Sequence, residues 1–527
     1  EAIGWRRIAL WLVLAAVPSG LMLSTTTHLT TDIFAMPLLW VIPLGLYLLS
    51  FVLAFADNRG PARAVGLAAP LVMLAAGGLA MTSRNSGTLA LALASVALLF
   101  VVAVVLHARM YELRPDPARL TLFYLVMSAG GALGGVFTAL IAPVLFDWVW
   151  EHPLLVIAAA LLMPLPAALD WRRMPGLDPG MARLSAGILL AGAAILAWLL
   201  LGETWNAPAT PLQAWLGAGI VALGLLLAPW RALFMIVLLM AMLAQGGAET
   251  ASATLEGVRM RSYFGIYTVR DYRSTHLRTL AHGTTLHGQQ STDPARRCAA
   301  MTYYGPGSGV AIALGQAQAM YGRGARIGVV GLGTGTLAAF HRPGERWRFY
   351  EIDPAVLRLS RNGAFTFLSG CAPDAEVRLG DARLELARDA PATLDVLVID
   401  AFSSDAIPLH LLTTEAFGVY LRALAPGGLL VVHISNRYFE LEPVLAAAAR
   451  QHGLAIAVRA DNPYDRTLLT PSTWVALSRD PARLKALAAA RPDAPWKAPL
   501  PPAPVAWTDD HASILPYIEW AKLLRQP

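Results

Sequence analysis

The sequence is short of charged residues and of cysteine. Asp, Glu, Lys and Arg make up 14% of its 527 residues, whereas an average soluble protein carries about 25% charged residues. Hydrophobic residues make up 56%, and the mean hydropathy is +0.52. This shortage of charge excludes a wholly soluble protein of ordinary composition, because a large part of the chain must be solvated by something other than water.

The chain contains two cysteines, Cys298 and Cys371, and their spacing does not match the clusters that bind metal ions. We therefore predict two separate thiols and no metal site. A disulfide between them is the alternative, and it requires that the second half of the chain face an oxidising compartment.

The net charge of +6 and the isoelectric point of about 9.4 would suit a protein that binds nucleic acid. Most arginines of the first half, however, lie in short loops between apolar segments. That distribution is typical of membrane topology rather than of a phosphate-binding surface. We predict no nucleic-acid partner.

Residues 1–250 contain nearly all the long apolar segments, so we predict an all-α polytopic domain in a lipid bilayer, the inner membrane of a bacterial-type cell. A membrane-spanning helix needs about 20 mostly apolar residues. Candidate spans lie at 8–24, 35–55, 64–82, 88–106, 120–145, 153–169, 184–202, 212–228 and 232–246. The last candidate is short and the sixth contains two prolines, so the prediction is eight or nine spans.

Two short runs inside this half have a distinctive composition. Residues 24–32 are mostly Ser and Thr, and we place them in a short loop between two spans. At membrane depth their His28 and Asp32 would be functional candidates. Residues 128–135 are mostly Gly and Ala, which predicts close packing between helices.

The second half resembles an ordinary soluble protein, so the prediction is a multi-domain chain. Short alternating strands predict a small β-sheet over residues 254–300. Strands and helices then alternate over residues 301–527, which is typical of an α/β Rossmann-like domain with a parallel sheet. The predicted strands of this domain lie within 327–330, 347–354, 377–382, 394–400 and 429–433.

A glycine-rich turn follows the first of these strands and precedes a helix. Gly331, Gly333 and Gly335 allow a tight turn and the close approach of a ligand. Glu351 ends the next strand, where a carboxylate can accept hydrogen bonds from ribose hydroxyls, and Asp381 is placed to bind an adenine amino group. These residues predict a nucleoside ligand, S-adenosylmethionine or a close relative, with NAD as the rival.

At these positions the second half resembles the spermidine synthase (aminopropyltransferase) family, and the whole chain resembles membrane-fused spermidine synthase-like proteins. The matching motifs are 331–335, 351–353, 380–382, 398–400 and 403–405, with 30–32, 114–117, 282–289 and 507–510 typical of the membrane-fused group. Such proteins often carry further helices upstream, so we expect a longer form of this chain.

The resemblance implies an enzyme that transfers an aminopropyl group from decarboxylated S-adenosylmethionine to an amine and releases methylthioadenosine, without a metal. It implies that Asp400 is the catalytic base, with Tyr303 and Tyr304 lining the amine channel. A helix cap (Asp400) and core packing (the tyrosines) are the alternatives. The other residues it assigns are Gln289, Gly331, Gly333, Thr334, Gly335, Glu351, Asp381 and Ala382 for the donor, and His282, Ser403 and Asp405 for the substrate.

Two positions depart from the family pattern. Thr334 replaces an Asp that contacts the donor's amino group, and Ser403 replaces an acidic residue after the catalytic Asp. Both changes remove carboxylates, so the donor could instead be intact S-adenosylmethionine. The alternatives are therefore a lyase or methyltransferase on the same scaffold, or a transporter or sensor of polyamines or nucleosides.

Orientation and assembly remain open at this stage. Arginines occur in alternate connections between the candidate spans, and the positive-inside rule assigns those connections to the cytoplasm. Eight spans would leave the second half in the cytoplasm and nine would leave it outside. Because the inferred donor is made in the cytosol, we predict a cytoplasmic catalytic domain. Spermidine synthases are dimers or tetramers, so a homodimer is a candidate assembly.

Overall fold

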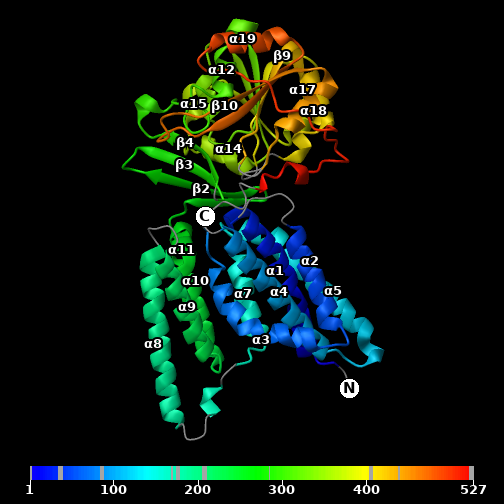
Figure 1. Cartoon of the computed structure of the whole chain (residues 1–527), viewed down its shortest axis with the longest axis vertical. Coiled ribbons are helices and arrows are strands. Elements are labelled where there is room, and N and C mark those ends of the chain that lie inside the picture. Colours follow the sequence, from blue (N-terminus) through cyan, green and yellow to red (C-terminus); the bar gives the residue numbers. More distant parts are fainter. Residues whose placement is uncertain are drawn as a thin grey trace. The chain divides into compact units, whose positions relative to one another are not determined.

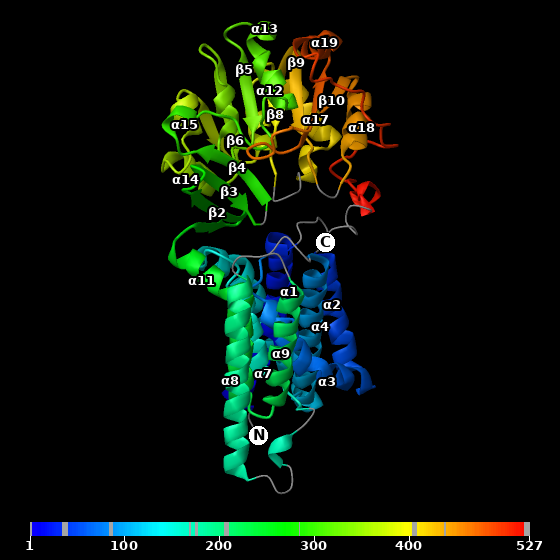
Figure 2. The same cartoon turned by 60° about the vertical axis from the view of Figure 1, so that its left-hand side comes forward.

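The structure is a computed structural model that describes residues 3–33, 40–83, 88–167, 170–173, 178–204, 210–283, 285–402, 408–436 and 439–520. The chain divides into two compact units (Figures 1 and 2). We call Glu1–Ile266 the helical unit and Tyr267–Arg525 the α/β unit.

The helical unit consists of apolar helices that lie side by side (Figure 1). Six of them are long and apolar enough to cross a membrane, and α2, α7 and α9 are shorter apolar helices. Each of the nine candidate spans overlaps one of these helices. The bounds are α1 Trp5–His28, α2 Val41–Phe55, α3 Gly60–Ala75, α4 Thr88–Glu112, α5 Leu120–Val136, α6 Ala142–Leu145, α7 Glu151–Leu162, α8 Pro179–Thr204, α9 Pro211–Leu226, α10 Arg231–Met242 and α11 Ala248–Leu255, followed by strand β1 Arg259–Ser262.

The loop predicted at residues 24–32 is wrong, because this run is helical. Helix α1 continues through it and ends in a π-helical turn, Leu29–Ile33. The hydroxyl groups of Thr26 and Thr30 donate to carbonyl oxygens four residues earlier, at 2.9 Å each. Threonines that bond to their own helix in this way need no water, so a polar run can stay helical among apolar neighbours.

Small residues allow α1 and α5 to approach closely, as the sequence predicts. A Cβ atom at Gly130 would lie 2.4 Å from the carbonyl oxygen of Leu12, and one at Gly134 would lie 2.2 Å from that of Ala16. Backbone atoms of two helices are therefore in contact along this interface. Any larger residue at either position must push the helices apart.

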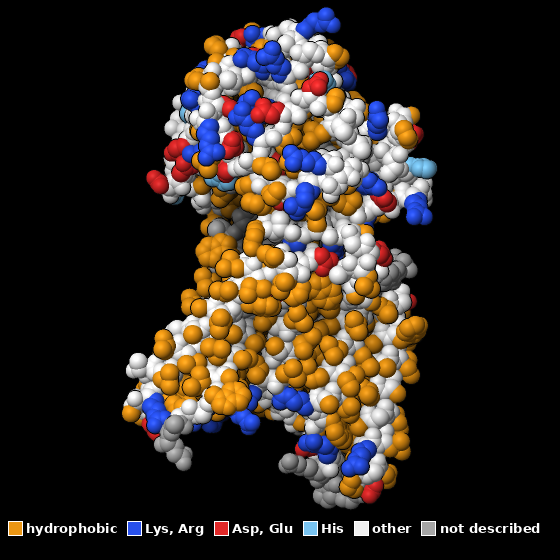
Figure 3. Space-filling model, turned by 180° about the vertical axis from the view of Figure 1, so that it is seen from behind, with side chains coloured by type: hydrophobic (Ala, Val, Ile, Leu, Met, Phe, Trp, Pro, Cys, Tyr) orange, Lys and Arg blue, Asp and Glu red, His pale blue; other side chains and the backbone are white. Residues whose placement is uncertain are grey.

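Large apolar side chains cover the face of the helical unit that Figure 3 shows. On α8 and α9, for example, Leu184 is 67% exposed, Trp198 75% and Trp215 77%. A soluble monomer rarely exposes a continuous apolar surface of this extent, so the surface is suited to contact with lipid.

Two sheets follow α11 along the chain. One is a small antiparallel sheet, whose first strand β1 belongs to the helical unit, and the other is a larger mixed sheet of the α/β unit. The small sheet has the order β1-β2-β3-β4, with β2 Gly265–Tyr272, β3 Leu277–His282 and β4 Thr285–Ser291. The larger sheet has the order β10-β11-β9-β8-β5-β6-β7. Its parallel strands are β5 Arg326–Val330, β6 Arg346–Glu351, β7 Glu376–Leu379, β8 Leu394–Ile399 and β9 Leu424–His433, and its antiparallel edge is formed by β10 Ala455–Asp461 and β11 Ser472–Ser478.

All five predicted strands of the larger sheet are present, whereas the antiparallel edge was not predicted. Helices cover both faces (Figure 2). The helices on one face are α12 Gly309–Gly315, α13 Ala317–Tyr321 and α19 Pro481–Ala490. Those on the other face are α16 Ala382–Arg388, α17 Thr414–Ala423 and α18 Glu442–His452. Two further helices, α14 Pro354–Arg361 and α15 Phe367–Cys371, follow β6. Strands covered on both faces become continuous apolar runs, which explains why β5, β8 and β9 are so apolar.

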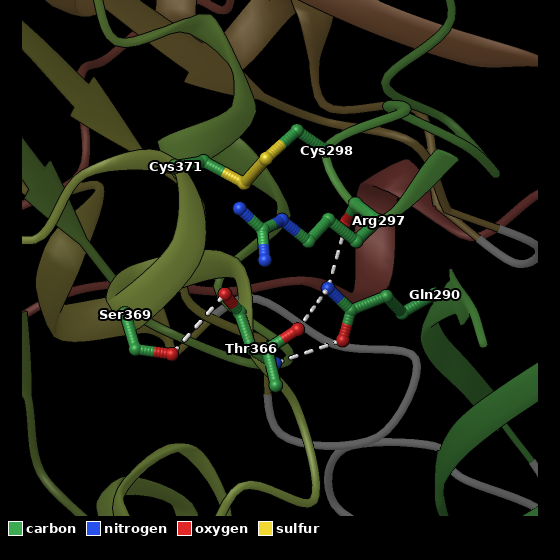
Figure 4. Close-up of a disulfide and its surroundings, with 6 residues drawn as sticks. All are labelled: Gln290, Arg297, Cys298, Thr366, Ser369 and Cys371. Carbon is green, nitrogen blue, oxygen red and sulfur yellow. Dashed lines mark hydrogen bonds between the residues drawn. A yellow bond between two sulfur atoms is a disulfide. The ribbon is translucent and has the colours of Figure 1, made fainter. Parts of the chain in front are cut away.

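The prediction of two separate thiols is wrong, because Cys298 and Cys371 form a disulfide with a Cα–Cα distance of 5.9 Å (Figure 4). The bridge joins the segment after β4 to the end of α15. The Gln290 side chain makes a second connection between the same elements, since its amide nitrogen donates to the Arg297 carbonyl and its oxygen accepts from the Thr366 backbone, both at 2.8 Å.

The contact between α1 and α5 leads to a test of stability. We expect Gly134→Ala to destabilise the protein by about 1–3 kcal/mol, because the added methyl group overpacks the interface. The measurement is the thermal unfolding midpoint of the full chain in detergent. Gly131→Ala is the matched control, since a Cβ atom there meets nothing within 4 Å. Equal midpoints for the two variants would contradict the close packing.

Candidate functional site

The glycine loop follows β5, and each of its three glycines has a positive φ angle: 96° at Gly331, 53° at Gly333 and 85° at Gly335. A Cβ atom at Gly331 would lie 2.3 Å from the backbone oxygen of Asp400. Only glycine fits there, because both the backbone conformation and the space exclude a side chain. The loop consequently lies directly against the end of β8.

Glu351 ends β6 beside this loop. One of its carboxylate oxygens accepts a hydrogen bond from the Leu332 backbone at 2.9 Å, and the other accepts from the Asp353 backbone at 2.8 Å. Burial raises the pKa of Glu351, and the two backbone donors oppose that rise. The side chain is therefore fixed in position, while each oxygen retains a lone pair for a further donor.

Asp381 follows β7 and caps α16. Its Oδ1 accepts from the Leu384 backbone at 3.0 Å, and its Oδ2 lies 3.3 Å from Nε2 of His410. Ala382 is the buried first residue of the same helix. The carboxylate predicted to contact adenine thus also has a structural role at a helix N-terminus.

The Asp400 carboxylate lies directly after β8 and has two side-chain partners. Its Oδ2 accepts from the Tyr304 hydroxyl at 2.6 Å, and its Oδ1 lies 2.8 Å from Nδ1 of His433 at the end of β9. The side chain of Asp400 is only 5% exposed and that of His433 only 3%. Asp400 does not cap a helix among the described residues, and its carboxylate is held from two sides.

A second hydrogen-bond partner of His433 indicates which of its two ring nitrogens carries the proton. The Thr473 backbone donates to Oγ of Ser435 at 2.8 Å, and this oxygen lies 2.7 Å from Nε2 of His433. If the serine hydroxyl donates to Nε2, then Nδ1 carries the proton and donates it to Asp400. The imidazole also stacks on Trp474, with ring centroids 4.2 Å apart. Its orientation is therefore determined by packing and by hydrogen bonds together.

The two predicted tyrosines lie next to each other in this network. Burial raises the pKa of Tyr304 well above its usual value, and the nearby Asp400 carboxylate raises it further. Burial likewise raises the pKa of Tyr303, whose hydroxyl donates to the His287 carbonyl at 2.9 Å. Both phenols consequently remain protonated donors at neutral pH.

The small sheet contributes Gln289 and His282. The Gln289 amide donates to the Leu468 carbonyl at 3.0 Å, and its neighbour Gly288 touches Thr334 of the glycine loop so closely that a Cβ atom would lie 2.5 Å from the threonine hydroxyl. Strand β4 therefore lies against the loop. His282 is buried at the end of β3, with its ring 4.9 Å from that of Tyr267.

The Thr334 hydroxyl is hydrogen-bonded within its own segment. Its Oγ1 lies 2.7 Å from Oγ1 of Thr336, and the side chain is buried. No carboxylate therefore occupies this position of the loop. Ser403 and Asp405, the other predicted substrate-binding residues, lie outside the residues that the structure describes.

The sequence predictions missed His433 as a site residue. It was recognised as the end of a strand, but not as a partner of Asp400. The signal was available, since ligands and functional groups gather at the carboxyl ends of parallel strands, and β9 was predicted next after β8. Across the described ranges, no group of three or more His, Cys, Asp or Glu side chains is arranged to hold a metal ion.

Comparisons with known proteins relate part of the chain to aminopropyltransferases. Over 93 residues it is 37% identical to the polyamine aminopropyltransferases of Mycobacterium tuberculosis and Mycobacterium bovis, a segment that covers 17% of this chain and 18% of each relative. No protein-family profile matches the chain.

Among solved structures, a probable spermidine synthase from Corynebacterium glutamicum aligns with a TM-score of 0.37 at 18% identity, covering 48% of this chain and 96% of that one. The spermidine synthase of Thermotoga maritima aligns with a TM-score of 0.31 at 14% identity, over 43% of this chain and 74% of that one.

Burial of His282 predicts a pH dependence of stability. Burial lowers the pKa of His282 to about 4 from 6.5. The unfolded chain therefore binds more protons between these values, and stability falls as pH decreases from 6.5 towards 4. On acidification the free energy of unfolding should therefore fall by up to about 3 kcal/mol less in His282→Gln than in the unsubstituted protein.

The measurement is the difference in unfolding midpoint between neutral pH and about pH 4.5. His511→Gln, at an exposed position, is the control and should behave like the unsubstituted protein. If His282→Gln loses as much stability on acidification as the control, the buried neutral imidazole is not responsible.

Proposed function

We propose that this chain, which over part of its length is a homologue of the polyamine aminopropyltransferases, is an integral-membrane transferase that moves an aminopropyl group to an amine. The donor is decarboxylated S-adenosylmethionine, and the second product is methylthioadenosine. The observation that carries the proposal is the Asp400 carboxylate, held by Tyr304 and His433 at a strand end that touches the glycine loop.

The donor's nucleoside part would bind at the ends of β5, β6 and β7. The glycine loop lets the ligand approach the backbone, and the fixed Glu351 carboxylate has lone pairs that can accept from the two ribose hydroxyls. Asp381 supplies a carboxylate at the adjacent strand end. Gln289 belongs to a strand that lies against the glycine loop, which supports a role at the donor.

The transfer requires an unprotonated amine. The nitrogen lone pair attacks the aminopropyl carbon next to the sulfonium, the carbon–sulfur bond breaks, and its electron pair stays on sulfur. The new ammonium then loses a proton. Asp400 can accept this proton and can hold the amine in line, because both of its oxygens are positioned by neighbouring donors. Tyr304 stays protonated and supplies one of those donors.

A second candidate reaction is favoured by Thr334. Its side chain is turned towards Thr336, so no carboxylate at this position can bind the donor's ammonium group. A lyase or methyltransferase that uses intact S-adenosylmethionine needs no such carboxylate. The same strand ends and the same glycine loop would hold that donor.

The membrane part of the proposal rests on the helical unit. Six helices long enough to span a bilayer, three shorter apolar helices and an apolar outer surface all fit insertion into lipid. We likewise propose that the acceptor is a small amine and that the chain forms a homodimer. In such an enzyme the helical unit would hold the catalytic unit at the membrane.

Product analysis tests the reaction. Purified full chain in detergent is incubated with S-adenosylmethionine or its decarboxylated form, with and without a diamine, and the products are identified by mass spectrometry. We expect an aminopropylated amine and methylthioadenosine. Asp400→Asn should lower the rate by at least about 100-fold, because the variant cannot accept the proton.

Asp465→Asn is the matched control, since this aspartate is exposed in the same unit, and it should leave the rate unchanged. Methylthioadenosine formed from intact S-adenosylmethionine without an acceptor would establish a lyase, and S-adenosylhomocysteine would establish a methyltransferase. Full activity of Asp400→Asn would overturn the assigned base.

A further inference from the structure

The helical unit contains a buried cluster of polar side chains that the proposed transfer reaction does not use. His28 and Asp32 lie at the end of α1, and His152 lies on α7. His28 and His152 are completely buried, and Asp32 is 3% exposed. The two imidazole rings stack with centroids 4.8 Å apart. Ionisable side chains enclosed by apolar helices are costly, so they are expected to be functional.

Hydrogen bonds define which nitrogen of each imidazole is free. Ser24 donates to the Leu21 carbonyl at 3.2 Å, so its oxygen accepts from Nδ1 of His152 at 3.1 Å. The Asp32 carboxylate lies 3.1 Å from Nδ1 of His28. In both rings Nε2 is left as a hydrogen-bond acceptor, and both Nε2 atoms are buried without a partner among the described residues.

The arginines described near the cluster have partners other than Asp32. Arg261 pairs with Glu151 through two hydrogen bonds of 2.8 and 2.7 Å. Arg259 lies over the ring of Trp148, and the Nε1 group of this tryptophan donates to Asp32 at 3.1 Å. Within the described residues, the only ion-pair partner of Asp32 is therefore His28. A buried carboxylate without a cation is strongly unfavourable, and uptake of one proton removes the imbalance.

We propose that His28, Asp32 and His152 form a proton-binding site. One proton is taken up by the His28–Asp32 pair, which becomes an imidazolium facing a carboxylate, and Nε2 of His152 is a second acceptor in the same cluster. A proton suits the site because it needs no cavity and because two acceptor nitrogens have no donor. The role of such a site in a membrane rests on the proposed insertion of the helical unit, whereas proton binding itself does not.

Trp148 offers a local probe, because its indole bonds to Asp32 and its ring centroid lies 6.0 Å from that of His28. The full chain is labelled with 5-fluorotryptophan, the Trp148 signal is assigned with Trp148→Phe, and its fluorine chemical shift is followed by NMR from about pH 4 to pH 9. We expect a single-proton titration that His28→Gln and Asp32→Asn abolish, and whose midpoint His152→Gln shifts.

His107→Gln is the control, because His107 is equally buried in the helical unit but bonds to Ser50 and stacks on Phe51. It should leave the titration of Trp148 unchanged. A Trp148 signal that does not respond to pH, or that responds equally in His28→Gln, would overturn the site. The readout needs no turnover, so it is independent of the proposed reaction.

A second inference concerns orientation and rests on different contacts. One end of the helical unit, which we call the arginine end, contains the bond from Arg7 to the Leu113 carbonyl at 2.9 Å and the bond from Arg231 to the Met163 carbonyl at 2.9 Å. The opposite end, which we call the histidine end, contains the bond from Thr82 to the Gln245 carbonyl at 2.7 Å and the His152–Ser24 bond.

These contacts show that the nine apolar helices of the described chain alternate in direction. The chain enters α1 at the arginine end, and α10 leads to α11 at the histidine end (Figures 1 and 2). A bond from Gln213 to the Glu203 carbonyl joins α8 and α9 at the histidine end, and Trp171 bonds to the Leu226 carbonyl at the arginine end. An odd number of crossings puts the start of α1 and the end of α10 on opposite sides of a bilayer.

The charges distinguish the two sides. Every connection between helices at the arginine end contains or adjoins arginine. The arginines at this end of the sequence are Arg6, Arg7, Arg59, Arg63, Arg109, Arg114, Arg119, Arg172, Arg173, Arg183 and Arg231. At the histidine end, Arg84 is the only Arg or Lys that the sequence places in the connections between helices. By the positive-inside rule the arginine end is cytoplasmic.

We infer that the α/β unit faces the oxidising side of the membrane, because the chain leaves the helical unit at the histidine end. The Cys298–Cys371 disulfide supports this orientation independently, since such bridges persist in oxidising compartments. The inference rests on the proposed membrane insertion, and it reverses the cytoplasmic orientation expected from the sequence. Because the proposed donor is made in the cytosol, this orientation requires that the donor cross the membrane before it reaches the α/β unit.

Thiol labelling in intact cells tests the orientation. In a Cys298→Ser, Cys371→Ser background, one new cysteine is placed either at Tyr464 of the α/β unit or at Asp116 of the arginine end, both exposed. A membrane-impermeant maleimide should label Tyr464→Cys in intact cells and Asp116→Cys only after permeabilisation. The reverse pattern would overturn the orientation, and labelling of both in intact cells would overturn membrane insertion as proposed. Neither outcome depends on catalysis.

Discussion

The close contact between the glycine loop and the end of β8 is the constraint on which the α/β unit depends. The Gly331 backbone donates to the Tyr350 carbonyl at 2.9 Å, and the Asp400 backbone donates to the Val330 carbonyl at 2.9 Å. Three strands are therefore joined at one point, where no side chain fits. This junction puts the Glu351 and Asp400 carboxylates at the ends of β6 and β8, the two strands that flank β5, so the proposed binding and chemistry would share one support.

Much of this arrangement could be predicted because its signals are local. A buried strand, three glycines and a short helical segment follow one another within about a dozen residues, although this segment is a 3-10 helix, Thr336–Phe340, rather than the expected longer helix. The nine apolar helices are equally local, since a long apolar segment needs no partner elsewhere in the chain to be recognised. Asp400 was identified from the resemblance to the aminopropyltransferase family, at a position directly after such a strand.

What could not be predicted depends on contacts between distant residues. Tyr304 meets Asp400 across 96 positions, and the two cysteines pair across 73. His28 and Asp32 were placed in a loop because their run is polar, whereas the threonines around them bond along the helix and keep it intact. Asp381 shows a different difficulty: an acid after a strand has the same sequence pattern whether it caps a helix or binds a ligand.

The Cys298–Cys371 bridge has a consequence for how the protein matures. It closes a ring of chain that contains β5, the glycine loop and β6, so all of these elements lie between the two linked positions. In the chain-entropy treatment, a ring of this length stabilises the folded state by about 4 kcal/mol. A newly made chain with reduced thiols lacks that contribution. A chain that never meets an oxidant is therefore less stable and remains the easier target for proteolytic quality control.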